Sequence, residues 1–136
     1  MKDLLKQLIR ADSTVGQGES AAAEVIAQRF REHGIDSRID RWDGRRSNVI
    51  ARVQTAGRRP ALLFVCHLDV VGPGEESWQY PPFAAVEESG RIYGRGAVDM
   101  KGPIAAVVTA ICDVVDSHTT LAGDIVFAAT AREPKL

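Results

Sequence analysis

The chain has 136 residues, enough for one ordinary domain and too few for two. Its apolar share of 45% and charged share of 26% are typical of a globular protein and argue against a disordered tail, a collagen-like repeat or a coiled coil. The 17 basic and 18 acidic side chains leave a net charge of -1, so we expect no general attraction to nucleic acid or to an anionic membrane.

Two amphipathic helices are predicted near the start of the chain. Apolar residues from Asp3 to Arg10 fall on one helical stripe, and a loop with two glycines follows. The same pattern runs from Ser20 to His33 and stops at Gly34, a residue typical of the position just past a helix.

The middle of the chain predicts strands. Residues from Ile35 to Trp42 roughly alternate in polarity, Asp43-Gly44 is a turn dipeptide, and Asn48 to Val53 is apolar and β-branched, which together predict a hairpin. Ala61 to Cys66 is continuously apolar, as expected for a strand covered on both faces in a mainly parallel sheet. We therefore expect this segment to be the central strand.

The last third continues the alternation of strands and helices. A short strand is predicted near Arg91 to Tyr93, Pro103 opens a helix that runs to about Asp116, and Gly123 to Thr130 forms another buried strand. This order predicts an α/β fold, a three-layer α/β/α arrangement around a mostly parallel sheet.

The apolar segments predict a protein of the cytoplasm. The longest apolar run, Ile104 to Cys112, has nine residues, whereas a membrane span needs about 20. The polar residues among the first seven do not resemble a secretory signal. Cys66 and Cys112 lie in apolar stretches, where free thiols behave as small buried hydrophobic groups.

His67 and Asp69 directly follow the predicted strand that ends at Cys66. In an extended backbone, residues two apart point to the same side, so an imidazole and a carboxylate lie together. Ligands of open α/β sheets bind at this end of a strand, and a carboxylate can fix the tautomer of a metal-binding histidine. The pair taken alone favours a metal-free hydrogen bond in a loop, because short His/Asp spacings are common by chance.

Asp99 comes 32 residues later, between Gly94-Arg95-Gly96 and the predicted Pro103 helix. An ionised carboxylate has two oxygens and can bridge two cations. The glycines could also form a phosphate cradle or a tight turn, although they match neither the dinucleotide fingerprint nor the P-loop pattern.

Taken together, these motifs resemble the zinc-dependent metallopeptidase and amidohydrolase family that includes acetylornithine deacetylase, succinyl-diaminopimelate desuccinylase and glutamate carboxypeptidase. The resemblance runs through essentially the whole chain in order. It is carried by two signature blocks, a spacer and the strand before the metal-binding strand: His67-Leu68-Asp69-Val70-Val71; Gly94-Arg95-Gly96 with Asp99-Met100-Lys101-Gly102; Trp78 with Pro81-Pro82-Phe83; and Ser47-Asn48-Val49-Ile50.

The resemblance implies a co-catalytic site for amide hydrolysis. In such a site His67 ligates one zinc, Asp99 bridges two zinc ions, and Asp69 orients His67. The two ions, roughly 3.5 to 4 Å apart, acidify a shared water and polarise the scissile carbonyl, while a glutamate takes the proton. Cobalt or manganese could replace zinc. The family also implies a cis peptide bond between Asp99 and Met100.

The chain departs from the family after the Gly123 to Thr130 strand. The family has an acidic pair there, a general base followed by a zinc ligand; Glu133 matches the base, and Pro134, which has no donor atom, replaces the ligand. A catalytic zinc normally has three protein ligands, and here only His67 and Asp99 have the right type. We therefore expect residues 1–136 to be the amino-terminal part of a catalytic domain, without the lid or dimerisation domain. Such a chain could be a truncated or frameshifted product or a remnant, and we expect it to be inactive alone.

Two other interpretations stay open at this stage. The chain could be a non-catalytic interaction module that forms homo-oligomers through an exposed sheet edge. A basic stretch around two turns could contact nucleic acid, although a solvated hairpin face is the more common use of such a stretch: Arg41, Arg45, Arg46, Arg52, Arg58 and Arg59. The partner expected from the resemblance is a small amide or peptide substrate.

Overall fold

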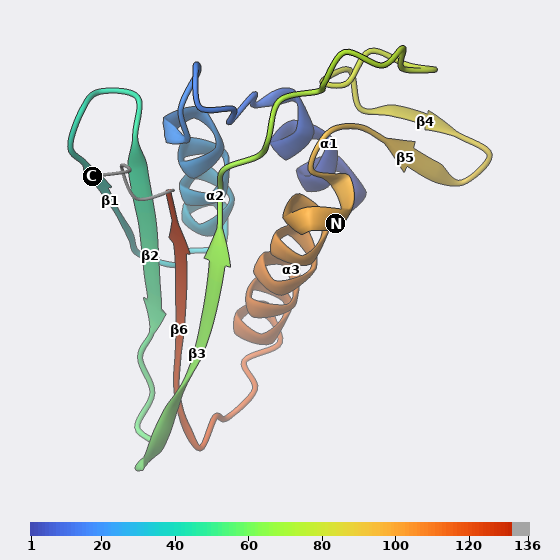
Figure 1. The fold of residues 1–136 in the computed structure, drawn as a ribbon. Helices are drawn as coiled ribbons and strands as arrows, with labels where there is room; N and C mark the ends of the chain where they lie inside the picture. The colour runs from blue at the N-terminus through green and yellow to red at the C-terminus, as the bar shows by residue number, and fades with distance from the viewer. Residues whose placement is uncertain (132–136) are drawn as a thin grey trace.

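The structure, a computed structural model, describes residues 1–131. A four-stranded sheet in the order β1-β2-β6-β3 packs against three helices, and a separate hairpin, β4–β5, lies beyond one end of the sheet (Figure 1). The elements are α1 (Lys2–Arg10), α2 (Ser20–Glu32), β1 (Ser37–Arg41), β2 (Ser47–Val53), β3 (Arg59–His67), β4 (Val86–Glu88), β5 (Arg91–Tyr93), an irregular turn η1 (Ala97–Lys101), α3 (Gly102–Asp116) and β6 (Gly123–Thr130).

The α/β class is confirmed, and the sheet is mixed. β1 pairs with β2 and β2 with β6 in antiparallel register, while β3 and β6 are parallel. The expected mostly parallel arrangement therefore holds only for the β3–β6 pair of the described sheet, because the predicted hairpin places two antiparallel strands beside it. All three helices pack on one face, so the described residues form two layers (Figure 1).

The prediction that β3 is a central strand covered on both faces is wrong for residues 1–131. β3 has one neighbour in this sheet and forms its edge. Phe64 faces the helices, whereas Leu63 and Val65 point to the other face and are 55% and 64% exposed. The unbroken apolar run arises because both faces of β3 are apolar, and residues 1–131 provide a cover for one of them.

The core lies between the helices and the inward face of the sheet. Every second residue of β2 and β6 points to the helices, so Val49, Ala51, Phe127 and Ala129 are buried. Phe127 meets Phe30 of α2 edge to face, with ring centroids 5.4 Å apart and an interplanar angle of 68°. The remaining core side chains come mainly from one stripe of each helix: Leu4, Leu8, Ala22, Ala23, Ile26, Ala27, Ile104, Ala105, Val108 and Ile111.

Both cysteines, Cys66 and Cys112, are buried and free, as predicted. Burial raises the pKa of each thiol, so neither is an activated nucleophile. No helix among residues 1–131 is both long and apolar enough to cross a bilayer.

Candidate metal site

His67 is the last residue of β3, at the end of the sheet where β3 and β6 stop together. The parallel register pairs His67 with Thr130, and the backbone N–H of Leu68 donates to the Thr130 carbonyl at 2.8 Å. This pairing fixes the position of the His67 side chain at the end of the sheet. The chain then turns toward α1 (Figure 1).

The His67 ring lies between two aspartates. Its Nε2 atom is 3.0 Å from Oδ1 of Asp99, and its Nδ1 atom is 3.1 Å from the Asp69 carbonyl oxygen and 3.4 Å from Asp69 Oδ1. Asp69 therefore approaches the ring from one side and Asp99 from the other. The side chains of His67 and Asp99 are 42% and 84% exposed, so an ion and a substrate could reach the Nε2 side from solvent.

The protonation of His67 reflects both burial and these acidic neighbours. Partial burial lowers the pKa of the imidazole, but the hydrogen bond to Asp99, the Asp69 carbonyl and the two carboxylate charges outweigh it, so the pKa lies above its ordinary value. The acidic neighbours therefore favour the protonated form of the ring when no ion is bound.

An irregular turn brings Asp99 to His67. Gly96 has φ +77°, a left-handed conformation that favours glycine. A β-carbon there would lie 2.6 Å from the Val70 side chain, so the turn can approach the loop after β3 only without one. Asp99 itself has extended backbone angles, and the Asp99–Met100 peptide bond is cis, as the resemblance predicted.

The Nε2 and Oδ1 atoms are close enough to share one divalent ion. Two donors about 2.0 to 2.1 Å from a tetrahedral zinc are about 3.3 Å apart, and the separation here is 3.0 Å. Small side-chain rotations would open the pair to that spacing. Within residues 1–131, however, no group of three or more His, Cys, Asp or Glu side chains is arranged to hold an ion.

The structure brings together three of the four predicted site residues. His67, Asp69 and Asp99 meet at the end of β3, while Glu133 lies outside the described residues, as does Pro134.

Sequence reasoning missed Lys101, which is 1% exposed and whose Nζ donates to the Ala11 carbonyl at 2.8 Å. Burial lowers the pKa of this amine to about 8. A single lysine between a turn and a helix carries no sequence signal of burial.

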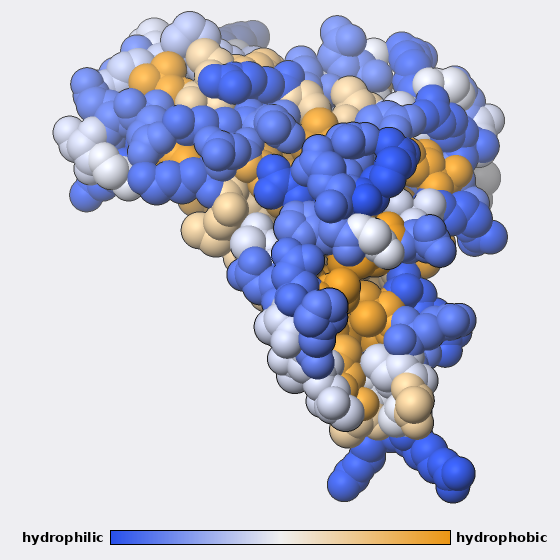
Figure 2. Space-filling view, turned by 180° about the vertical axis from the view of Figure 1, so that it is seen from behind, coloured by the Kyte–Doolittle hydropathy of each residue, from blue (hydrophilic) through white to orange (hydrophobic). Residues whose placement is uncertain are grey.

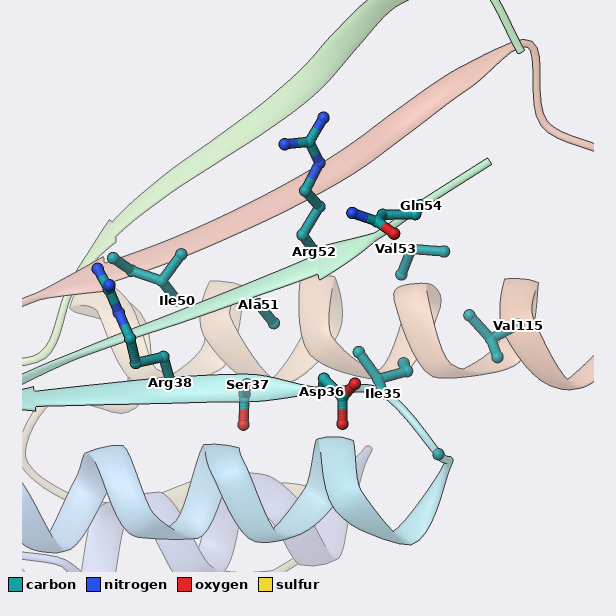
Figure 3. A pocket seen from close by; sticks show the side chains of 11 residues that line it. Ile35, Asp36, Ser37, Arg38, Ile50, Ala51, Arg52, Val53, Gln54 and Val115 are labelled. Atoms are coloured by element: carbon teal, nitrogen blue, oxygen red, sulfur yellow. The ribbon is translucent and has the colours of Figure 1, made fainter. Parts of the chain in front are cut away.

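A hollow of about 620 Å³ lies toward the other end of the sheet, between the start of β1 and the ends of β2 and α3 (Figure 3). Arg38 and Arg52 extend from the strands away from the helices, whereas Asp36 and Ser37 point toward α2 (Figure 3). Arg52 also forms an ion pair with Asp124 at 2.6 Å. Because the polar groups do not converge on one point, this hollow offers no catalytic arrangement.

The sequence model of peptidase family M20/M25/M40 matches residues 63–134, which is more than half of the chain. The chain belongs to this family. The matched segment contains the two loops that carry His67, Asp69 and Asp99, and it also includes Glu133. The similarity expected from the two signature blocks is therefore confirmed.

Solved structures show the same fold. An M20 family metallo-carboxypeptidase from Sulfolobus solfataricus superposes with a TM-score of 0.81 at 25% identity, covering 93% of this chain and 29% of that one. Human carnosine dipeptidase 1 gives 0.73 at 22% identity, covering 94% and 31%. A dinuclear metal-binding M20 peptidase from Bacillus subtilis gives 0.62 at 16% identity, covering 93% and 34%. The chain spans about a third of the length of these structures.

Proposed function

We propose that this M20 family chain supplies the His67–Asp99 half of a divalent-metal centre, with zinc as its ion, in a hydrolase of peptides or N-acyl amino acids. The observation that carries the proposal is the approach of His67 Nε2 to Asp99 Oδ1, 3.0 Å apart at the open end of β3. Imidazole and carboxylate are the donors that zinc, cobalt and manganese accept.

Each of the three residues has a separate role in this proposal. The Asp69 carbonyl accepts the Nδ1–H of His67, which leaves Nε2 with its lone pair free for a metal. The two oxygens of Asp99 allow it to contact one ion or to bridge two. A bound ion would act as a Lewis acid that polarises the scissile carbonyl and acidifies the attacking water. We propose Glu133 as the group that takes the proton of that water.

Peptide substrates are supported by the relatives. The similar structures are described as a carboxypeptidase, a dipeptidase and a dinuclear metal-binding peptidase. All three names indicate hydrolysis of a peptide bond, and two of them also name a metal. Since His67 and Asp99 are two donors and a catalytic zinc usually has three, we expect the 136-residue chain to hydrolyse no peptide when assayed alone.

A chimera tests this function. In the Sulfolobus metallo-carboxypeptidase, the part of the superposing segment that corresponds to residues 1–131 is replaced by those residues, so that the position of Pro134 keeps the carboxypeptidase's own residue. The zinc-loaded chimera is expected to hydrolyse carboxypeptidase substrates, and Asp99→Asn in the chimera is expected to reduce kcat at least about 100-fold, because a neutral amide is a poor metal ligand and cannot bridge. A folded, zinc-loaded chimera without turnover would contradict the proposal, as would full activity of its Asp99→Asn form.

The exposed strand β3 favours a second candidate, self-association of the chain. Its outward Leu63 and Val65 side chains are more than half exposed. An apolar groove of about 420 Å³ also opens between β3 and α3, lined by Leu62, Phe64 and Val107 among others. Hydrophobic residues form a strip along the narrow lower part of the molecule (Figure 2). An edge strand with apolar faces is a template for pairing with another chain.

Replacing both Leu63 and Val65 by lysine tests the second candidate. If the chain associates through β3, sedimentation velocity of the wild-type chain shows a dimer that the double variant converts to monomer, because charges at this edge oppose pairing. Arg38→Lys, on the opposite edge strand β1, serves as the control and is expected to keep the dimer. A wild-type chain that sediments as a monomer at high concentration rules this candidate out.

A further inference from the structure

The segment that follows α1 contacts the loop of His67. Ser13 is fully buried; its hydroxyl donates to the Leu68 carbonyl at 2.7 Å, and its own carbonyl accepts from the Val70 N–H at 3.1 Å. These two hydrogen bonds hold the backbone on either side of Asp69. Ser13 therefore fixes the loop whose Asp69 carbonyl faces the His67 ring.

The same segment contacts the turn of Asp99. The buried Lys101 amine donates to the Ala11 carbonyl, and the Lys101 N–H donates to the Gly96 carbonyl at 2.8 Å. Burying an amine with a carbonyl partner is costly, and an apolar side chain of similar length would fill the same space at lower cost. A lysine at this position is better explained by the bond it makes than by packing.

Residues 11–13 thus connect the two halves of the candidate metal site. His67 ends β3 and Asp99 lies in η1, and their 3.0 Å approach depends on how these two segments are held together. Besides the bond between these two side chains, the His67 N–H donates to the Met100 side-chain sulfur at 3.2 Å, and sulfur is a weak acceptor. The hydrogen bonds of Ser13 and Lys101 are stronger, and they tie both segments to a third one, residues 11–13.

We propose that Ser13 and Lys101 are positioning residues, which hold the His67 and Asp99 loops at the separation needed to share one divalent ion. The metal part of this inference rests on the function proposed above. Neither residue touches the ion or the substrate. Groups that orient metal ligands from behind typically change metal affinity 10- to 100-fold when removed.

The test uses Ser13→Ala and Lys101→Met in the 136-residue chain, with Ser47→Ala as a matched control. Ser47 is also fully buried, but its hydroxyl is hydrogen-bonded at 2.7 Å to that of Ser20, which belongs to α2 and not to a metal-site loop. Two readouts are taken: the ring-nitrogen NMR signals of His67 in metal-free protein, and the affinity for zinc by calorimetry. Thermal melting confirms that each variant is folded at the temperature used.

Both site variants are expected to shift the His67 ring signals and to weaken zinc binding about 10- to 100-fold, while Ser47→Ala keeps both readouts even where it melts at a lower temperature. Unchanged ring signals in a folded Ser13→Ala or Lys101→Met chain would overturn the inference, and so would equal changes in Ser47→Ala. If the wild-type chain binds no zinc, the proposed metal site fails, yet the ring signals of the metal-free protein still decide whether these residues position His67.

Discussion

The His67→Ala chain is expected to show no saturable zinc binding in a calorimetric titration at neutral pH. His67 provides the nitrogen donor of the pair, and its removal leaves Asp99, whose side chain is 84% exposed, as a single solvated carboxylate. One such carboxylate holds zinc weakly in water. We expect the loss to exceed about 100-fold, beyond the range for groups that only orient a ligand.

His33→Ala is the matched control for this titration. His33 is also partly exposed and also faces an aspartate, with Nδ1 2.8 Å from Asp116 Oδ2, but it lies at the carboxyl end of α2, away from the β3 loop. Its removal is expected to leave the zinc affinity within about twofold. Equal losses of zinc affinity in His33→Ala and His67→Ala would show that zinc binds non-specifically to exposed histidines and not at the proposed site.

The Phe127→Ala chain is expected to lose about 3 to 5 kcal/mol of unfolding free energy, measured by urea denaturation. Phe127 is 1% exposed, sits on the strand between β2 and β3, and meets Phe30 edge to face. Truncation removes the ring contact with Phe30 of α2 and leaves a cavity in the core between the sheet and the helices.

Val126→Ala provides the comparison for this loss. Val126 is the adjacent residue of β6, but it points to the sheet face that carries no helix and is only partly buried. We expect its truncation to cost about 1 kcal/mol or less, because less apolar area leaves water and little cavity forms. If the two substitutions cost the same, the helices do not cover the face of the sheet to which Phe127 points.

Local patterns predicted the helices and strands well. The helical stripe before Arg10, the glycine after the second helix and Pro103 near the start of the third each predicted a boundary to within a few residues. The Asp43-Gly44 turn predicted the β1–β2 hairpin correctly. These features depend on neighbours in the chain, which is why sequence periodicity and turn residues reveal them.

Features that depend on partners distant in the chain were less predictable. The apolar run of β3 indicated burial on both faces, yet the strand forms the edge of the described sheet, since a run shows that both faces are apolar and not which segments cover them. Likewise, His67 and Asp69 were predicted to lie together from strand geometry, whereas the meeting of His67 with Asp99 followed from the family resemblance. The buried Lys101 gave no sequence signal.

Zinc anomalous diffraction from crystals of the 136-residue chain grown with zinc tests the central claim most directly. The account predicts an anomalous peak in contact with both His67 Nε2 and a carboxylate oxygen of Asp99, with the Asp69 carbonyl still facing Nδ1. Ordered zinc found only elsewhere, for example between His33 and Asp116, with His67 still hydrogen-bonded directly to Asp99, would contradict it.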